Sequence, residues 1–184
     1  MGYKVSPSLA GPLADKEPWP LKFYRHAFSA AHFNTQRCRI VYNDYLFTRL
    51  TGDAPAGAMP AHFLAEWSAS HNVTPENIGG KTFPGPVLVQ WTALDGSPHT
   101  ASVDLDAIFK DRLLLHKVAL DEVREAWLDS YRLEPDIPDI LLAVDDRTIS
   151  VYMRAVVITE REQIPGNPHS CLRDDLMLAW TQTY

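Results

Sequence analysis

The sequence predicts an α+β fold in which a mainly antiparallel β-sheet of about six strands carries two short helices. Large apolar residues occupy every second position along 87–92 and again along 149–159, which is the period of a strand. Asp95 and Gly96 follow the first of these stretches and supply the turn of a β-hairpin. Apolar residues recur at helical spacing along 120–131, which predicts an amphipathic helix.

Four further elements are predicted before residue 106. Dense aromatic residues predict strands at 21–28 and at 39–47. Residues 61–70 carry Phe63, Leu64 and Trp67 at helical spacing and predict a short helix. Residues 100–105 return from the Asp-Gly turn and predict the second strand of the hairpin.

The second half adds another hairpin. A single helical turn is predicted at 106–110 and a short apolar strand at 112–116. The hairpin joins 140–144 to 149–159 through an acidic turn, and its long second strand, apolar on both faces, is typical of the centre of a sheet. Residues 172–184 fit either a helix or a strand, and their polar ending favours the strand.

The chain is expected to form a single domain over 1–184, because 184 residues can bury a core without a disulfide framework or a structural metal. Four prolines predict an extended arm over 1–20. Trp19 lies in this arm, where it would fasten the arm to the body or contact a partner. The two cysteines, Cys38 and Cys171, suit a reducing compartment, so we expect a cytoplasmic protein.

The charge pattern favours a protein partner over a nucleic acid or a membrane. The net charge is −6, with no basic block to neutralise phosphates, and no apolar run approaches the roughly 20 residues of a membrane-spanning helix. Acidic residues gather around the second hairpin. This cluster predicts a docking surface, for which a basic protein would be complementary in charge. The residues are Asp136, Asp139, Asp145 and Asp146.

No motif predicts a cofactor. The seven histidines include no pair at His-x-x-x-His or His-x-His spacing, which would aim two imidazoles at one metal ion. No Gly-x-Ser-x-Gly elbow is present, and residues 79–82 lack the upstream glycine of a phosphate-binding loop. The sequence therefore leans away from an enzyme.

One stretch, Phe-Ser-Ala-Ala-His-Phe at 28–33 followed by Cys38, resembles the 6-pyruvoyl-tetrahydropterin synthase family. The resemblance implies a zinc ligand at His32 and a nucleophile at Cys38. The chain departs from the family at 42–44, where Tyr-Asn-Asp replaces the pair of histidines that completes the zinc site. A metal-dependent enzyme of this kind would have to use His32, Asp44 and His116.

Three functions from different classes therefore stay open. The leading hypothesis is a soluble, non-catalytic binding protein of the bacterial immunity or antitoxin type, which neutralises a partner by covering it. The second is the divergent metal-dependent enzyme. The third is a structural subunit in which sheet edges pair between copies of the chain.

Overall fold

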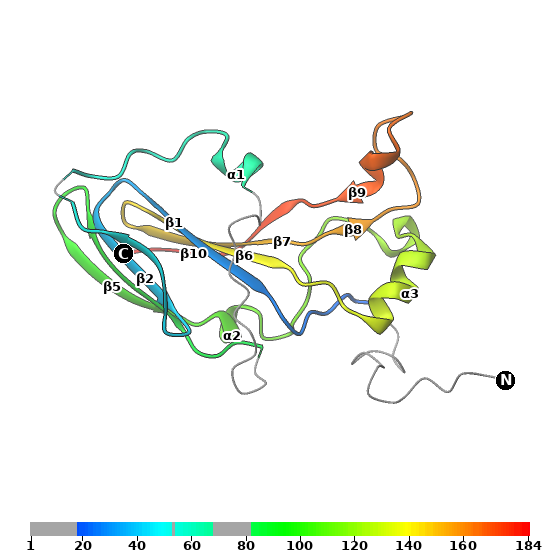
Figure 1. Ribbon diagram of the computed structural model, residues 1–184, viewed down its shortest axis with the longest axis horizontal. Helices are drawn as coiled ribbons and strands as arrows, with labels where there is room; N and C mark the ends of the chain where they lie inside the picture. The colour runs from blue at the N-terminus through cyan, green and yellow to red at the C-terminus, as the bar shows by residue number, and fades with distance from the viewer. Residues whose placement is uncertain (1–17, 53, 68–81) are drawn as a thin grey trace.

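The computed structural model describes residues 18–52, 54–67 and 82–184, and within them it confirms the α+β class with mainly antiparallel sheets. The strands lie in two four-stranded sheets and one two-stranded sheet, where the sequence predicted one sheet of about six. The first sheet has the order β1-β6-β7-β10 and the second the order β3-β2-β4-β5 (Figure 1). Their strands are β1 (Ala27–Phe33), β6 (Asp139–Asp145), β7 (Thr148–Arg154), β10 (Leu176–Thr183), β3 (Tyr45–Leu50), β2 (Thr35–Tyr42), β4 (Val87–Ala93) and β5 (Pro98–Val103).

The remaining elements are short. Strands β8 (Val157–Ile158) and β9 (Leu172–Arg173) form the two-stranded sheet. In Figure 1, α1 lies above the first sheet and α3 lies at the end opposite β2 and β5. None of the helices in the described part of the chain is long and apolar enough to cross a lipid bilayer. The helices are α1 (Phe63–Glu66), α2 (Leu105–Ile108) and α3 (Glu125–Leu133), with 3₁₀ turns at Leu120–Glu122 and Pro168–Cys171.

Strand β6 is the centre of the molecule, because every side chain from 140 to 144 is buried. Ile140, Leu142 and Val144 face the second sheet and join a core with Cys38 and Ile40. The intervening side chains of β6 face the opposite side of the first sheet, where the segment around α1 covers them. Strand β1 runs parallel to β6 along one edge, and β7 runs antiparallel along the other.

The single strand predicted at 39–47 is wrong. Two strands, β2 and β3, occupy this region and pair with each other. They are joined at Asn43 and Asp44, whose φ angles are 51° and 61°. This positive-φ pair is the backbone of a tight hairpin turn, and asparagine and aspartate adopt it more readily than other non-glycine residues. This turn is missed from the sequence because aromatic residues, which favour strands, lie on both sides of it.

Two further predictions are wrong, and in both regions the structure has an isolated β-bridge to a distant segment. The helix predicted along 120–131 is interrupted, because Val123 forms a β-bridge with Thr159 and the Arg124 amide donates to the Ile158 carbonyl at 2.9 Å. The strand predicted at 112–116 is reduced to one bridge between Leu113 and Lys22. The predicted hairpin turn at Gly96, with a φ of 85°, and the C-terminal strand β10 are both confirmed.

The turn between β6 and β7 fastens the two sheets together. The Trp91 indole N–H donates to the Asp146 carbonyl at 2.7 Å, and the Leu94 amide donates to the Asp146 carboxylate at 2.9 Å. The Asn34 side chain donates to the Asp145 carboxylate at 2.6 Å. These two aspartates therefore accept structural hydrogen bonds from the other sheet and from the β1–β2 turn.

The role of Asp146 can be tested by substitution. Asp146→Ala should lower the free energy of unfolding by about 1–2 kcal/mol, because the Leu94 amide loses its acceptor and alanine tolerates a positive φ poorly. Asp146→Asn should cost less than half as much, since asparagine keeps both an acceptor and the backbone preference. Urea denaturation measures both values, and equal losses would show that the side chain makes no structural hydrogen bond.

Stability should also depend on His26, which is buried and whose Nε2 lies 3.0 Å from the Tyr42 hydroxyl. Burial lowers the pKa of His26 from 6.5 to about 4. Between these values the unfolded chain binds the proton and the folded protein does not. Stability should therefore fall as the pH decreases from about 6.5 to about 4, by about 3 kcal/mol for this group.

Urea denaturation across this pH range would measure the effect of His26. His26→Gln should flatten the decline, because glutamine does not titrate, and His169→Gln, at an exposed position, should leave it as in the wild type. A decline that is identical in the wild type and in His26→Gln would rule out His26 as its source.

Candidate binding cleft between α1 and β1

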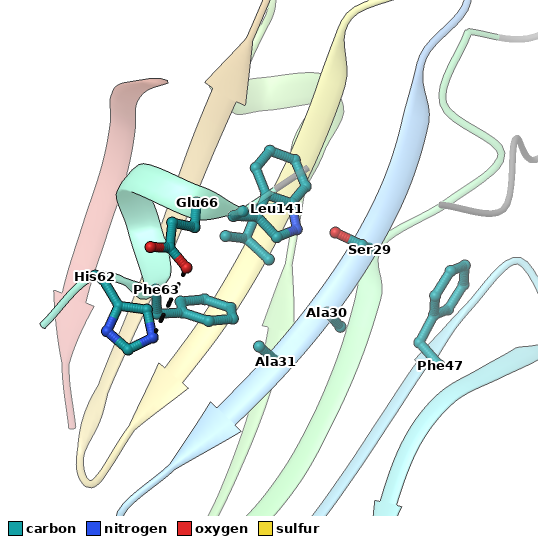
Figure 2. Close-up of a pocket in the computed structure, with 9 residues that line it drawn as sticks. Ser29, Ala30, Ala31, Phe47, His62, Phe63, Glu66 and Leu141 are labelled. Carbon is teal, nitrogen blue, oxygen red and sulfur yellow. Dashed lines mark ion pairs between the residues drawn. The ribbon is translucent and has the colours of Figure 1, made fainter. Parts of the chain in front are cut away.

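A cleft of about 490 Å³ lies along β1, with α1 on one side of the strand and Phe47 of β3 on the other (Figure 2). Small side chains of β1 form its floor, and aromatic side chains of two other segments, β3 and the segment around α1, form its walls. This combination of an apolar wall with few polar groups is typical of a ligand site. The lining residues are Ser29, Ala30, Ala31, Phe47, His62, Phe63, Glu66, Trp67 and Leu141.

Helix α1 is held over the sheet by Arg154 of β7. The Arg154 guanidinium donates to the carbonyls of Leu64 and Ala65 at 3.3 and 3.4 Å, where the end of the helix leaves carbonyls without intrahelical partners. The same group lies 5.6 Å from the centre of the Trp67 ring and 3.7 Å from an Asp174 carboxylate oxygen. Arg154 therefore decides where the aromatic wall of the cleft stands.

The floor of the cleft is an open strand edge. The Ala27 amide donates to the Pro138 carbonyl at 2.9 Å, so the odd-numbered residues of β1 direct their backbone groups at β6. The even-numbered residues direct theirs away from β6, and within the described residues no second strand pairs with them. Near Phe28 the Phe47 ring packs edge-on against the Phe28 ring, with ring centres 4.7 Å apart. The backbone of Ala30 therefore opens into the cleft.

Ser29 supplies a polar group that the described structure leaves unused. Its side chain is only 9% exposed, and its hydroxyl has no hydrogen-bond partner. Figure 2 shows this hydroxyl directed from β1 toward the α1 side of the cleft. Leaving a buried hydroxyl unpaired costs about 1–3 kcal/mol, which a ligand with a donor or an acceptor would recover.

The cleft is equipped for binding. Its histidine, His62, lies at the rim, with Nε2 3.8 Å from the Glu66 carboxylate, and both side chains are exposed. A nucleophilic serine needs a hydrogen-bonded base, and the Ser29 hydroxyl forms no such bond among the described residues. The arrangement therefore offers a shaped apolar surface and one strand edge, beside a buried hydroxyl without a partner.

The metal site suggested by the sequence is not assembled. His32 lies on β1 with Nδ1 3.1 Å from the Thr35 hydroxyl, whereas Asp44 lies in the β2–β3 turn. His116 packs edge-on against Trp19, with ring centres 5.2 Å apart. In the described ranges, no three His, Cys, Asp or Glu side chains are grouped to hold a metal ion. The triad fails because its members belong to segments that the fold keeps apart.

The cysteine chemistry implied by the resemblance is also contradicted. Cys38 is part of the hydrophobic core between the sheets. Burial raises the pKa of its thiol to about 12, so the nucleophilic thiolate is not available near neutral pH. Cys38 and Cys171 are both free thiols.

The predicted acidic surface is divided between two ends of β6. Asp139 begins the strand and Asp145 ends it, six residues further on, so they lie about 20 Å apart at about 3.3 Å per residue. Asp145 and Asp146 accept the structural hydrogen bonds described above. Asp136 is partly buried at the other end, where burial and then the Glu134 carboxylate raise its pKa. The four carboxylates therefore do not form one continuous surface.

Trp19 packs against the body of the protein, half-buried beside the core and against His116. Of the two roles expected for Trp19, the structure shows the one that fastens the segment to the body, and little of the ring is left for contact with a partner. The rest of the predicted arm, at 1–17, lies outside the described residues, as do residues 79–81 of the 79–82 stretch.

The sequence did not identify the cleft. The spacing of Phe63 and Trp67 predicts only a short helix, and the small residues at 29–31 enter only the resemblance that implied a zinc ligand at His32. Three small residues followed by a histidine could have suggested an uncovered strand, but no local signal places α1 opposite them.

Substitution of Arg154 should loosen α1. Arg154→Met should lower the free energy of unfolding by about 2 kcal/mol, since it removes charged hydrogen bonds and a cation–π contact. Amide hydrogen exchange in α1 should accelerate at the same time. The stability and the exchange rate of Arg154→Lys should fall between those of the wild type and of Arg154→Met, because an ammonium lacks the planar fork of the guanidinium. Unchanged exchange in α1 with Arg154→Met would contradict this role.

The chain matches no protein-family model, no curated protein and no solved structure. Function is therefore inferred from the geometry of the two sheets and of the cleft.

Proposed function

We propose that the protein is a non-catalytic binding domain that holds an extended segment of a protein partner against β1. The observation that carries the proposal is the edge of β1 with which no described strand pairs, and which opens at Ala30 into a cleft with aromatic walls. An added strand gains affinity from main-chain hydrogen bonds and specificity from the pockets that receive its alternate side chains. Strand β1 offers the main-chain groups for such hydrogen bonds, and the cleft offers a pocket for a side chain.

Strand β1 also lacks the protection that natural edge strands carry. Exposed edges are commonly guarded by lysine, proline or a bulge, each of which prevents another strand from pairing. The sequence of β1, Ala-Phe-Ser-Ala-Ala-His-Phe, contains no lysine and no proline, and its register with β6 is continuous. An edge of this kind favours a partner strand.

The cleft supports an apolar side chain as the anchor of that segment. Its volume of about 490 Å³ accommodates one large side chain, and the Phe63, Trp67 and Leu141 side chains would surround it. The Ser29 hydroxyl would pair with a polar group of the same segment. The partner segment is therefore expected to combine an extended backbone with one bulky apolar residue.

This proposal is compatible with a protein that neutralises its partner by covering it. A segment held along β1 would be withdrawn from the partner's own function, which is the action of an immunity or antitoxin protein. The two free thiols support a reducing compartment such as the cytoplasm.

A phage-displayed library of random peptides tests the proposal. Selected peptides should slow amide exchange at Ala30 and His32, the β1 positions that face away from β6 and are not blocked by Phe47. Ala31→Phe, which fills the cleft, should weaken binding by about tenfold or more. Ala126→Phe, at an exposed position of α3, is the matched control and should bind as the wild type does.

Two outcomes would contradict the proposal. Peptides that bind with no change along β1 would place the site elsewhere, and full affinity in a folded Ala31→Phe protein would show that the cleft is not occupied.

The alternative occupant of the edge is a second copy of the chain, as in the structural-subunit hypothesis. Light scattering at high protein concentration distinguishes the two, because pairing of β1 between copies requires a dimer or a larger assembly. A monomer that still binds the selected peptides would assign the edge to a different partner.

A further inference from the structure

Three arginines converge on the solvent-facing side of the second sheet. Arg37 and Arg39 lie two residues apart on β2, so both project from the same face at a separation of about 7 Å. Arg49 lies on β3 directly opposite Arg39 in the antiparallel register. All three are exposed. Figure 1 shows β2 and β5 at the margin of the molecule, with no helix outside them in this view.

These three arginines lack the acidic neighbours that six of the other eight arginines have. Six arginines elsewhere each lie within 4.0 Å of a carboxylate: Arg25, Arg112, Arg132, Arg147, Arg154 and Arg173. Among the described residues, Arg37, Arg39 and Arg49 form no ion pair, and they line a shallow depression of about 390 Å³ in which no described residue is acidic. Like charges directly opposite each other in a sheet are destabilising. The stability of the sheet alone gives no reason for this arrangement.

The same face carries an apolar row beside the arginines. Val41 pairs with Leu46 on one side and with Leu88 on the other, so the three side chains share the arginine-bearing face. Leu46 is 41% exposed and Leu88 is 48% exposed. Exposed aliphatic side chains next to arginines are a composition typical of protein–protein interfaces.

We propose that this arginine face binds an acidic, extended segment of a protein partner. The arginine face is defined by Arg37, Arg39 and Arg49 with the apolar row of Val41, Leu46 and Leu88. Alternate side chains of an extended segment are about 7 Å apart, which matches the separation of Arg37 and Arg39. Each guanidinium can hold a carboxylate through two parallel hydrogen bonds.

The neighbouring side chains favour a protein over a nucleic acid. Sheets that bind single-stranded nucleic acids present aromatic rings on which bases stack. Here the row of Arg39 and Arg49 continues across the sheet through Gln90 and Thr100, and Arg37 pairs with Thr92. An overall charge of −6 also opposes a long polyanion, whereas a short acidic segment interacts mainly with the local face.

The face shares no residue with the β1 cleft, although Phe47, which lines the cleft, lies on the same strand β3 as Leu46 and Arg49. It also differs from the expectation of a basic partner, which the acidic hairpin suggested. Failure of one site in an experiment therefore leaves the other site testable.

A binding experiment with a defined probe tests the arginine face. The probe is a short peptide in which Asp and Thr alternate, and the matched control peptide has Asn in place of Asp. The wild-type protein should bind the Asp peptide at low salt, more weakly as salt increases, and should not bind the Asn peptide. The triple variant Arg37→Gln, Arg39→Gln, Arg49→Gln should lose about tenfold or more in affinity.

A second triple variant controls for overall charge. Lys110→Gln, Lys117→Gln, Arg161→Gln removes three positive charges at exposed positions elsewhere and should retain the wild-type affinity. The melting temperature of the arginine variant should equal or exceed that of the wild type, because its repulsive pair is gone. Equal loss in both variants, or a marked drop in the melting temperature of the arginine variant alone, would overturn the proposal. Tighter binding of an oligothymidine strand than of the Asp peptide would assign the face to nucleic acid and overturn it too.

Discussion

Strand β6 must be covered on both faces, and most of the structure follows from this requirement. Burial of each large aliphatic side chain contributes about 1.5–3 kcal/mol, and all the residues from 140 to 144 are buried. The second sheet covers one face and builds the main core around Ile140 and Val144. The other face needs a separate cover, which the short segment ending at Trp67 supplies. Arg154 holds that segment in place.

The cover is incomplete at the edge of the sheet, and the candidate cleft lies there. Strand β1 carries small side chains between Ser29 and Ala31, so α1 and the sheet do not close upon each other. Among the described residues, the result is a strand edge without a paired strand, a hydroxyl without a partner and an aromatic wall in one place. A bound segment, as proposed, would supply partners to the strand edge and to the hydroxyl. The short helix α1 both covers the sheet and borders the proposed binding site.

The charges divide between structural and exposed roles in a way that net charge does not reveal. Asp145 and Asp146 accept hydrogen bonds that fasten the β6–β7 turn to the second sheet, so these acids act within the fold. The arginines at 37, 39 and 49 are exposed and unpaired among the described residues, so they are the stronger feature for recognition. An acidic protein thus presents a basic face, because strand register concentrates a few arginines where the sequence disperses them.

The sequence by itself determined the fold class, the hairpin at Gly96, the β6–β7 hairpin and the C-terminal strand. These depend on alternation and on turn chemistry, which act between near neighbours. Only the tertiary structure decided the break at Val123, the cover over Leu141, the separation of His32 from His116, and the meeting of Arg39 with Arg49. Each of these depends on which distant segments pair and pack. A one-dimensional pattern does not specify such pairing, because register is set by the burial of the whole core.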